Sequence, residues 1–409
     1  MSSYGDLMQT YAREVWWNRA TVHGSTRQYG NVKVSLTPSA TIYHGTFISD
    51  LAGLIPDGLP GERANDLVIT NANPEIAMGL LYQRQRFSST MAGKLTWRLF
   101  DINNGPLHRV ASFLSPSLVW LTQYRTPHLS TELTVTLADD ATSCDKLGGA
   151  MMVTGYNSIH RGRDIPKTLP SATAAWELKY SNPMDGFYSG LSLDASRRSM
   201  LIADRAIVGN HVITSDSDYV SDMNSLGGVL SLSKGFFSLD GKIDALLGYS
   251  AYTAQLLQNG ISYDYKGRTI SVSAEWTLSP VKWLVLSSKS RFSSLAIGVS
   301  GVAKQIPNSK LVEDFEMVFR ATDRISLNAS VNYYLNVSGR TRAQLALVNA
   351  ACVMMLQNGM NLFLRCSNIL NETEYGYSTY GPLMESYTYY TIRPMNVIAG
   401  IDFSLRFGR

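Results

Sequence analysis

The strongest constraint in this sequence is a two-residue alternation of apolar and polar side chains that recurs along most of the chain. From Ile325 to Leu335 the odd-numbered residues are apolar or aromatic, whereas the even-numbered ones include Ser326, Asn328 and Ser330. Successive residues of a β-strand point to opposite faces, so the pattern predicts a strand with one apolar and one polar face. A chain built from such segments is predicted to be all-β.

We count about 16 such segments, most of them about 10 to 15 residues long, beginning near 31, 75, 89, 108, 128, 171, 187, 226, 241, 268, 281, 309, 323, 341, 360 and 395. Soluble strands have about 5 to 6 residues, whereas a tilted membrane strand needs about 9 to 11. The lengths therefore predict an antiparallel transmembrane β-barrel over residues 31–409. Residues 1–30 stay unassigned and are compatible with a remnant of upstream strands.

The connections between these segments alternate in length. Short connections are expected near 182–186 and 357–359, and long ones near 139–170, 198–225 and 372–394. Short turns at one end and long loops at the other are typical of an outer-membrane barrel. Because backbone polar groups must be paired within a bilayer, a sheet can span it only as a closed ring.

Composition excludes several other classes of protein. The chain is 45% hydrophobic and 17% charged, with a formal net charge of +4. It has no apolar run of the roughly 18 residues that a spanning helix needs, and it is too apolar for a disordered chain. The basic residues are scattered, so no nucleic-acid partner is expected. Cys144, Cys352 and Cys366 are too few for a disulfide framework and lack zinc-site spacing.

One hairpin can be placed in register from the sequence alone. Asn358-Gly359 is the favoured pair for a two-residue type I′ turn. That turn would put Cys366 opposite Ala351. Cys352 and Cys366 would then point to opposite faces of the sheet, so no disulfide is expected between them.

Aromatic residues near the strand ends are candidates for the girdles that meet the lipid headgroups. Ordinary sheet packing is the alternative for each of them. The candidates are Trp97, Trp120, Trp176, Trp276, Trp283, Tyr375, Tyr387, Tyr389 and Tyr390.

The segment from Arg365 to Tyr375 resembles the penultimate strand of TonB-dependent outer-membrane receptors. In that family the strand ends in Ser/Val-x-Asn-Leu-Phe/Leu-Asp/Asn, with a Tyr a few residues later. The matching positions in this chain are Asn368, Ile369, Leu370, Asn371 and Tyr375.

The end of the chain carries the second part of the resemblance. Arg393-Pro394 and the alternating strand that ends at Phe407 are similar to the closing strand of the family, with its aromatic-ended assembly signal. Gly408 and Arg409 follow Phe407, so the strictly terminal aromatic is missing. The match covers about 360–407 and is a pattern only before that. The composition of the chain, rich in Asn, Tyr and Met, is similar to that of receptors of Bacteroidetes-type bacteria.

The resemblance implies a receptor with a signal peptide, a plug domain and a 22-stranded barrel. The first residues of this chain do not form a secretory signal, and no plug is recognised. The expectation is therefore the C-terminal barrel portion, with about 16 strands corresponding to strands 7 to 22. Its location would be the cell outer membrane. Its partners would be outer-membrane lipid, a nutrient bound by the extracellular loops, and the TonB system only where a longer or separate chain supplies a plug.

The implied function is uptake of a large nutrient such as a metal chelate, a cofactor or an oligosaccharide. A self-contained passive pore and a non-functional truncated receptor are the alternatives. A membrane enzyme would need a convergent Ser/His/acid set, and a soluble adhesin would need a second sheet over its apolar faces.

No catalytic, metal-binding or cofactor-binding constellation is recognised. The six His residues are dispersed, and no Gly-x-Ser-x-Gly elbow surrounds Ser189 or Ser192. The chain is therefore predicted not to be an enzyme. Ligand contact, as an alternative to packing between loops, is considered for Tyr156, His160, Arg161, Arg163, Tyr219, Tyr377, Tyr380 and Tyr387.

Overall fold

A computed structural model describes most of the chain. The described residues are 8–22, 27–52, 64–105, 107–141, 151–155, 158–161, 166–208, 212–258, 260–301, 306–339, 341–356, 360–380 and 385–403. Within these ranges, no helix is long and apolar enough to cross a membrane.

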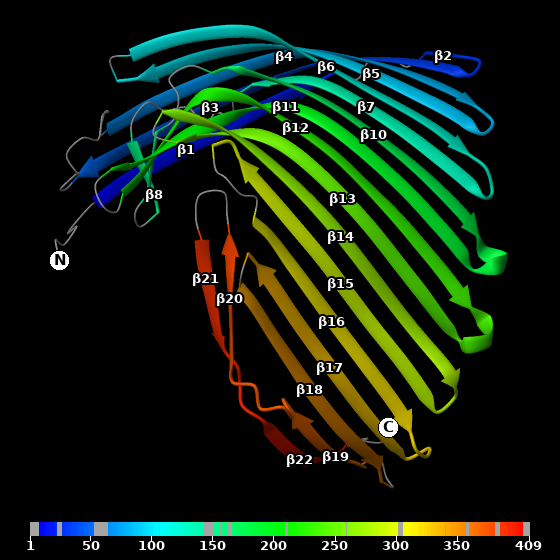
Figure 1. Ribbon diagram of the computed structural model, residues 1–409. Helices are drawn as coiled ribbons and strands as arrows, with labels where there is room; N and C mark the ends of the chain where they lie inside the picture. The colour runs from blue at the N-terminus through cyan, green and yellow to red at the C-terminus, as the bar shows by residue number, and fades with distance from the viewer. Residues whose placement is uncertain are drawn as a thin grey trace, which may run out of the picture.

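The described chain is almost entirely β-strand, as Figure 1 shows. Two single-turn 3-10 helices, Pro183–Asp185 and Phe237–Leu239, form tight connections. The strands of the main sheet are β1 (Met8–Thr21), β2 (Arg27–Tyr29), β3 (Val32–Ala52), β4 (Ala64–Arg84), β5 (Phe87–Asn104), β6 (Leu107–Arg125), β7 (Leu129–Ala141), β8 (Met151–Gly155), β9 (Ser158–Arg161), β10 (Thr168–Asn182), β11 (Phe187–Val208), β12 (Val212–Phe236), β13 (Gly241–Gln258), β14 (Ile261–Val281), β15 (Leu284–Val299), β16 (Ile306–Arg320), β17 (Ile325–Ser338), β18 (Thr341–Met355), β19 (Met360–Ser367) and β22 (Asn396–Phe403). A separate hairpin consists of β20 (Glu374–Tyr380) and β21 (Glu385–Thr391).

The long strands form one continuous antiparallel meander. Apart from the short β2, β8 and β9, 17 of the 20 strands of this sheet follow one another from β1 to β22, each antiparallel to the next. The prediction of an all-β antiparallel fold is confirmed. All of the 16 expected segments correspond to strands of this meander, and β1 adds one more strand in residues 1–30, where the alternation is interrupted.

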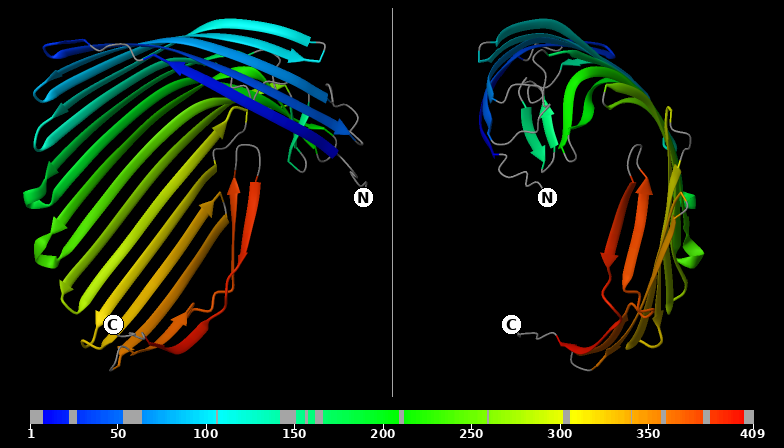
Figure 2. Two further views of the ribbon diagram at one scale, coloured as in Figure 1. Left: turned by 180° about the vertical axis from the view of Figure 1, so that it is seen from behind. Right: turned by 60° about the vertical axis from the view of Figure 1, so that its left-hand side comes forward.

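The sheet curves like the wall of a barrel but is open (Figure 2). In the described residues β1 pairs only with β3, and β22 pairs only with β19, so the two edge strands are not joined to each other. The closed ring expected from the sequence is therefore not observed. The β20–β21 hairpin lies on the concave side of the sheet (Figure 2).

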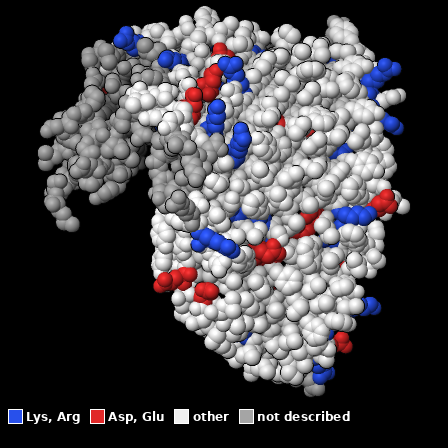
Figure 3. Space-filling model, viewed as in Figure 1, with Lys and Arg blue, Asp and Glu red and all other residues white. Residues whose placement is uncertain are grey.

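Around Val331 the register places apolar residues on one face of the sheet and polar residues on the other. Val331 lies opposite Phe315 on one side and Val348 on the other, whereas Asn332 lies opposite Asp314. The face with Val331 is convex, since the hairpin covers part of the opposite face. Leu247 on this convex face is 49% exposed and Leu364 is 51% exposed. Figure 3, drawn from the convex side, shows charged side chains separated by broad areas without charge.

The buried apolar core is correspondingly small. Leu67, Ile69, Phe100 and Ile102 form a buried cluster at the loop end of β4 and β5, and Phe47, Ala111 and Phe113 pack against it. This cluster lies on the concave face, since these residues share the register of Glu75 and Thr96. Phe100 and Phe113 stack with ring centroids 5.6 Å apart.

The strands extend further at the loop end than the sequence predicts. Most of the expected loop 198–225 belongs to β11 and β12. Backbone hydrogen bonds between neighbouring strands do not require alternating side chains, so a hairpin can continue where both of its faces meet water. The short connection expected near 182–186 is confirmed between β10 and β11, at 183–186, and a second short connection joins β12 to β13 at 237–240.

The predicted register of the β18–β19 hairpin is wrong by one residue. Cys366 lies opposite Ala350, and Ala351 lies opposite Arg365, so the connection is one residue longer than a two-residue turn. A shift of one residue moves a side chain to the other face. Cys352 and Cys366 therefore share the convex face, and both are free thiols.

The aromatic candidates for the headgroup girdles divide into two groups. The five Trp residues belong to β5, β6, β10 and β14 and to the β14–β15 connection, and Trp97, Trp120 and Trp283 are at least 41% exposed. Their role at a headgroup region stays a prediction. The four Tyr residues belong to the β20–β21 hairpin, so the girdle assignment is wrong for them.

Candidate ligand-binding site on the concave face

The residues of the recognised motif hold the base of the β20–β21 hairpin. Asn368 follows the last residue of β19 and has a φ of 53°, so the chain turns sharply away from the sheet. Its backbone N–H donates to Asn349 Oδ1 at 3.0 Å. Its Nδ2 donates to the carbonyl oxygens of Glu372 at 2.7 Å and Arg393 at 2.8 Å. One buried side chain thereby ties the entry and exit of the hairpin together.

Asn371 makes the second connection at this base. It also has a positive φ, 56°, and its Oδ1 accepts a hydrogen bond from the backbone N–H of Met395 at 2.9 Å. Asn adopts this left-handed conformation more readily than most residues other than Gly. The two Asn residues explain locally why the chain leaves the sheet after Ser367 and returns to it at β22.

The hairpin has two aromatic faces. Tyr375 lies opposite Tyr390, and Tyr377 occupies the same face, which packs against the sheet. Tyr387 and Tyr389 lie on the other face and are 67% and 50% exposed. On that face the ring of Tyr387 covers Gly376, where a Cβ atom would collide with it.

A cavity of about 620 Å³, called the tyrosine cavity below, lies between the hairpin and the concave wall. Tyr375, Tyr377 and Tyr390 border it from the hairpin, and Tyr334 borders it from β17. Tyr377 and Tyr390 stack with ring centroids 6.4 Å apart. The other lining residues are Ser293, Leu295, Asn308, Ser309, Lys310, Asn336, Leu345, Leu347, Thr379 and Ile392.

Two of the phenols that border this cavity, those of Tyr375 and Tyr390, have pKa values raised above the usual one. Burial, followed by the neighbouring Tyr377, Tyr390 and Tyr334, raises the pKa of Tyr375 above its usual value near 10. A hydrogen bond with Tyr377 raises the pKa of Tyr390 as well. Lys310 is the one Lys or Arg among the described lining residues. The cavity thus offers flat rings, hydroxyl and amide groups and one cation.

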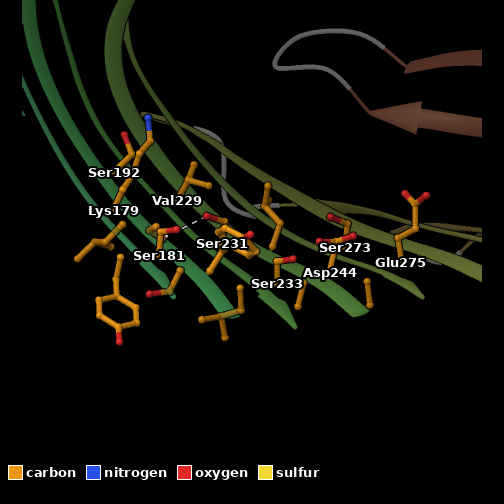
Figure 4. Close-up of a pocket in the computed structure, with 18 of the residues that line it drawn as sticks. Lys179, Ser181, Ser192, Val229, Ser231, Ser233, Asp244, Ser273 and Glu275 are labelled. Carbon is orange, nitrogen blue, oxygen red and sulfur yellow. Dashed lines mark hydrogen bonds between the residues drawn. The ribbon is translucent and has the colours of Figure 1, made fainter. Parts of the chain in front are cut away.

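A second hollow lies on the concave wall over β10 to β15, with a volume of about 670 Å³ (Figure 4). Its floor is built from small residues: Gly190 of β11 lies opposite Ser231 of β12, and a Cβ atom at Gly190 would meet the Ser231 hydroxyl at 2.7 Å. Figure 4 shows Ser231 and Ser233 of β12 and Ser273 of β14 along this floor. The small side chains leave the wall hollow at this point.

Ion pairs border this hollow. Lys289 pairs with Glu275 at 2.8 Å, and Arg291 pairs with Asp314 at 3.0 Å. At the same hollow, Lys179 pairs with Glu177 at 2.8 Å and Lys242 with Asp244 at 2.9 Å. The charges are mutually compensated, so the concave wall is polar without a large field of one sign.

Among the predicted contact residues whose side chains the structure describes, one lines a cavity. Tyr377 lines the tyrosine cavity, and Tyr387 lies on the opposite face of the hairpin. Tyr156 and Arg163 lie outside the described residues, as does Cys144, and the side chains of His160, Arg161, Tyr219 and Tyr380 are not described.

Sequence reasoning missed the part of the cavity that the wall contributes. Tyr334 occupies a polar-face position of β17, in an alternation where Asn332 and Asn336 are its neighbours. An aromatic residue on the polar face was the available signal. In the described residues, no group of three or more His, Cys, Asp or Glu could hold a metal ion.

No family model and no curated protein matches the sequence. Three solved structures of bacterial receptors are similar to the chain. They are a mutant ferric enterobactin receptor PfeA from Pseudomonas aeruginosa (8% identity, 88% of this chain and 75% of the other, TM-score 0.30), the siderophore receptor PiuA from Acinetobacter baumannii (8%, 97%, 79%, 0.28) and the ferric-catecholate import receptor Fiu from E. coli K12 (10%, 97%, 80%, 0.29). TM-scores of 0.28 to 0.30 with 8 to 10% identity do not assign a fold or a function to this chain.

Proposed function

We propose that this chain forms the barrel wall of an outer-membrane receptor of the TonB-dependent type, which takes up a large nutrient. The observation that carries the proposal is the division of one very large sheet into an exposed apolar convex face and a polar concave face. Exposing apolar residues such as Leu247 and Leu364 to water along so many strands would be costly, whereas lipid is a suitable solvent for them.

The hairpin base supports the receptor assignment over a generic pore. The motif residues Asn368 and Asn371 have a specific structural task, which is to send the chain inward at the loop end. The tyrosine cavity that results faces the concave side, where a nutrient entering the ring would pass. Aromatic faces combined with amide and hydroxyl groups suit a ligand with rings and polar substituents.

The ligand is a metal chelate, a cofactor or an oligosaccharide, and the chain has no enzymatic role in this proposal. The TonB system becomes a partner where a longer or separate chain supplies a plug. The passive pore is the weaker reading, because the described sheet is open, and an open edge in lipid leaves backbone groups unpaired.

Fractionation of the source cell tests the proposal directly. The native product should be found in the outer-membrane fraction, should resist carbonate extraction and should dissolve only in detergent. Deleting the gene should then lower energy-dependent accumulation of one of three labelled probes: ferric citrate, cobalamin or maltoheptaose. A product that partitions into buffer without detergent would overturn the membrane assignment.

A further inference from the structure

One carboxylate lies on the convex face, which the proposed function turns toward lipid. Glu313 is the central residue of β16, seven residues from either end of that strand. It lies opposite Tyr333, and Phe315, two residues further along β16, lies opposite Val331. Side chains two residues apart on a strand share a face, so Glu313 lies on the convex face with Val331.

The neighbouring strands keep other charged side chains away from this position. Asp314 and Glu316 of the same strand lie on the concave face, where Asp314 is opposite Asn332. Within β15 to β18 as the structure describes them, the other charged residue of the convex face is Arg342, the second residue of β18 at the loop end. Glu313 is therefore a single charged group in an otherwise uncharged area.

The position of Glu313 along its strand corresponds to the middle of a bilayer. Phe319, six residues toward the turn end, packs against the predicted girdle residue Trp283 with ring centroids 5.4 Å apart. Six residues of a strand tilted by about 40° rise about 15 Å, which is close to half of an apolar band about 25 Å tall. Ionisable groups at this depth are costly, and in membrane proteins they are normally paired.

Polar side chains surround this carboxylate on the convex face. The Ser288 hydroxyl, on a residue that is 5% exposed, donates to Glu313 Oε1 at 2.5 Å. Ser290 of β15 and Tyr333 of β17 lie directly opposite Glu313 on its two sides. These four residues form a polar area that we call the Glu313 patch. A carboxylate has sites for about four hydrogen bonds, and Ser288 fills one of them.

We propose that the Glu313 patch is a lateral docking site for a transmembrane segment of another protein, which places a Lys or Arg side chain against the carboxylate. Lipid tails supply neither a donor nor a positive charge, and a cation at this depth has to come from a membrane-embedded segment. A symmetric contact between two copies centred on the patch would bring two carboxylates together, so the partner is a different chain. This inference rests on the proposed membrane location.

Photo-crosslinking in outer membranes that contain the full-length native product tests the proposal. The crosslinking residue p-benzoylphenylalanine replaces Phe292, an exposed ring of the convex face whose strand neighbour Ser290 belongs to the patch. A control variant carries it at Leu193 of β11, an exposed convex-face residue six residues from the turn end of its strand. The Phe292 variant is then combined with Glu313→Gln or with Glu316→Gln, which changes a concave-face carboxylate of the same strand.

The expected result is a crosslink from position 292 to a transmembrane segment of one other protein, which mass spectrometry shows to carry Lys or Arg, and no such crosslink from position 193. Glu313→Gln should lower the crosslinked fraction by about tenfold or more, because it removes one partner of a desolvated charge pair, and Glu316→Gln should leave it unchanged. Combining Glu313→Lys with replacement of the partner's cation by Glu should restore the crosslink.

Adducts with lipid alone, or with a second copy of this chain, would overturn the proposal. Equal crosslinking in the Glu313→Gln and Glu316→Gln variants would overturn the role of the carboxylate. These outcomes leave the proposed function standing, because they are read in a product that is present in the outer membrane. A product missing from the outer-membrane fraction would refute the proposed function and this inference together.

Discussion

The side-chain amide of Asn368 donates a hydrogen bond to the carbonyl oxygen of Arg393 at 2.8 Å. These residues are far apart in sequence, and between them the chain makes the whole β20–β21 hairpin. The bond closes the base of the hairpin, on which Tyr375, Tyr377 and Tyr390 face the concave wall. Asn368, which belongs to the motif recognised in the sequence, thus holds the two ends of the hairpin together.

Replacing Asn368 with Ala should loosen this hairpin. The substitution removes two side-chain donor bonds and places a residue with a Cβ and no compensating amide at a φ of 53°. Loss of buried hydrogen bonds of this kind costs about 1 to 3 kcal/mol. We expect faster proteolysis within 374–391 and a lower temperature of heat modification on gels. Asn368→Asp keeps the Oδ1 acceptor for the Glu372 N–H and should be milder; equal effects would refute the amide's role.

The face assignment predicts opposite outcomes for two neighbouring positions. Val331→Arg puts a charge on the convex face and should impair assembly, at a cost of roughly 2 to 4 kcal/mol near the middle of a bilayer. Asn332→Arg lies on the concave face beside Asp314, with which the new guanidinium can pair. Folded barrel yield and heat modification would measure both. Equal sensitivity of the two variants would contradict the assignment.

The observed register of β18 and β19 can be tested with a disulfide. In a background with Cys144 and Cys352 changed to Ser, Ala350→Cys should form a disulfide with Cys366 on mild oxidation, because the two residues are directly opposite. Ala351→Cys lies opposite Arg365 and should not form one. Thiol titration and intact mass would distinguish the variants. A disulfide in the Ala351→Cys variant alone would support the two-residue turn.

The tyrosine cavity should show a high-pH transition. The pKa of Tyr375 is raised by burial and by its neighbours, so the folded hairpin favours the neutral phenol. The stability that this contributes is fully present below about pH 10, the unfolded pKa, and is lost as pH rises through the higher folded pKa. Absorbance near 295 nm should show late phenolate formation that Tyr375→Phe removes. Tyr387→Phe, which changes an exposed ring, is the control.

The ion pairs of the concave wall should contribute little to stability. Lys289 and Glu275 are about half exposed, and exposed pairs typically contribute 0 to about 1 kcal/mol. We therefore expect Lys289→Gln to change heat modification only slightly. A large loss of stability would show that the wall is dehydrated in the assembled protein.

Much of the fold follows from local pattern. The alternation from Ile325 to Leu335 defines a strand and both of its faces, since a strand residue's neighbour always points to the other side. Short connections such as 183–186 also follow from the pattern, because a turn is a local structure. The sequence motif identified the position at which Asn368 turns the chain.

Other features depend on contacts between distant segments. The loop ends of β11 and β12 are set by backbone pairing that continues past the alternating residues. The alternation therefore does not predict where these two strands end. The predicted register was wrong by one residue at Cys366 because the free energy of a favoured turn is small compared with that of a complete strand ladder. Tyr334 and Tyr377 form one cavity only because the hairpin folds onto the wall.

The residue pattern is sufficient to define an antiparallel sheet with one apolar and one polar face, because side-chain direction alternates with every residue of a strand. The register, the inward hairpin and the separation of the two edge strands are visible only in the folded chain. These depend on which backbone groups pair across long separations in sequence, and many pairings satisfy the same local alternation.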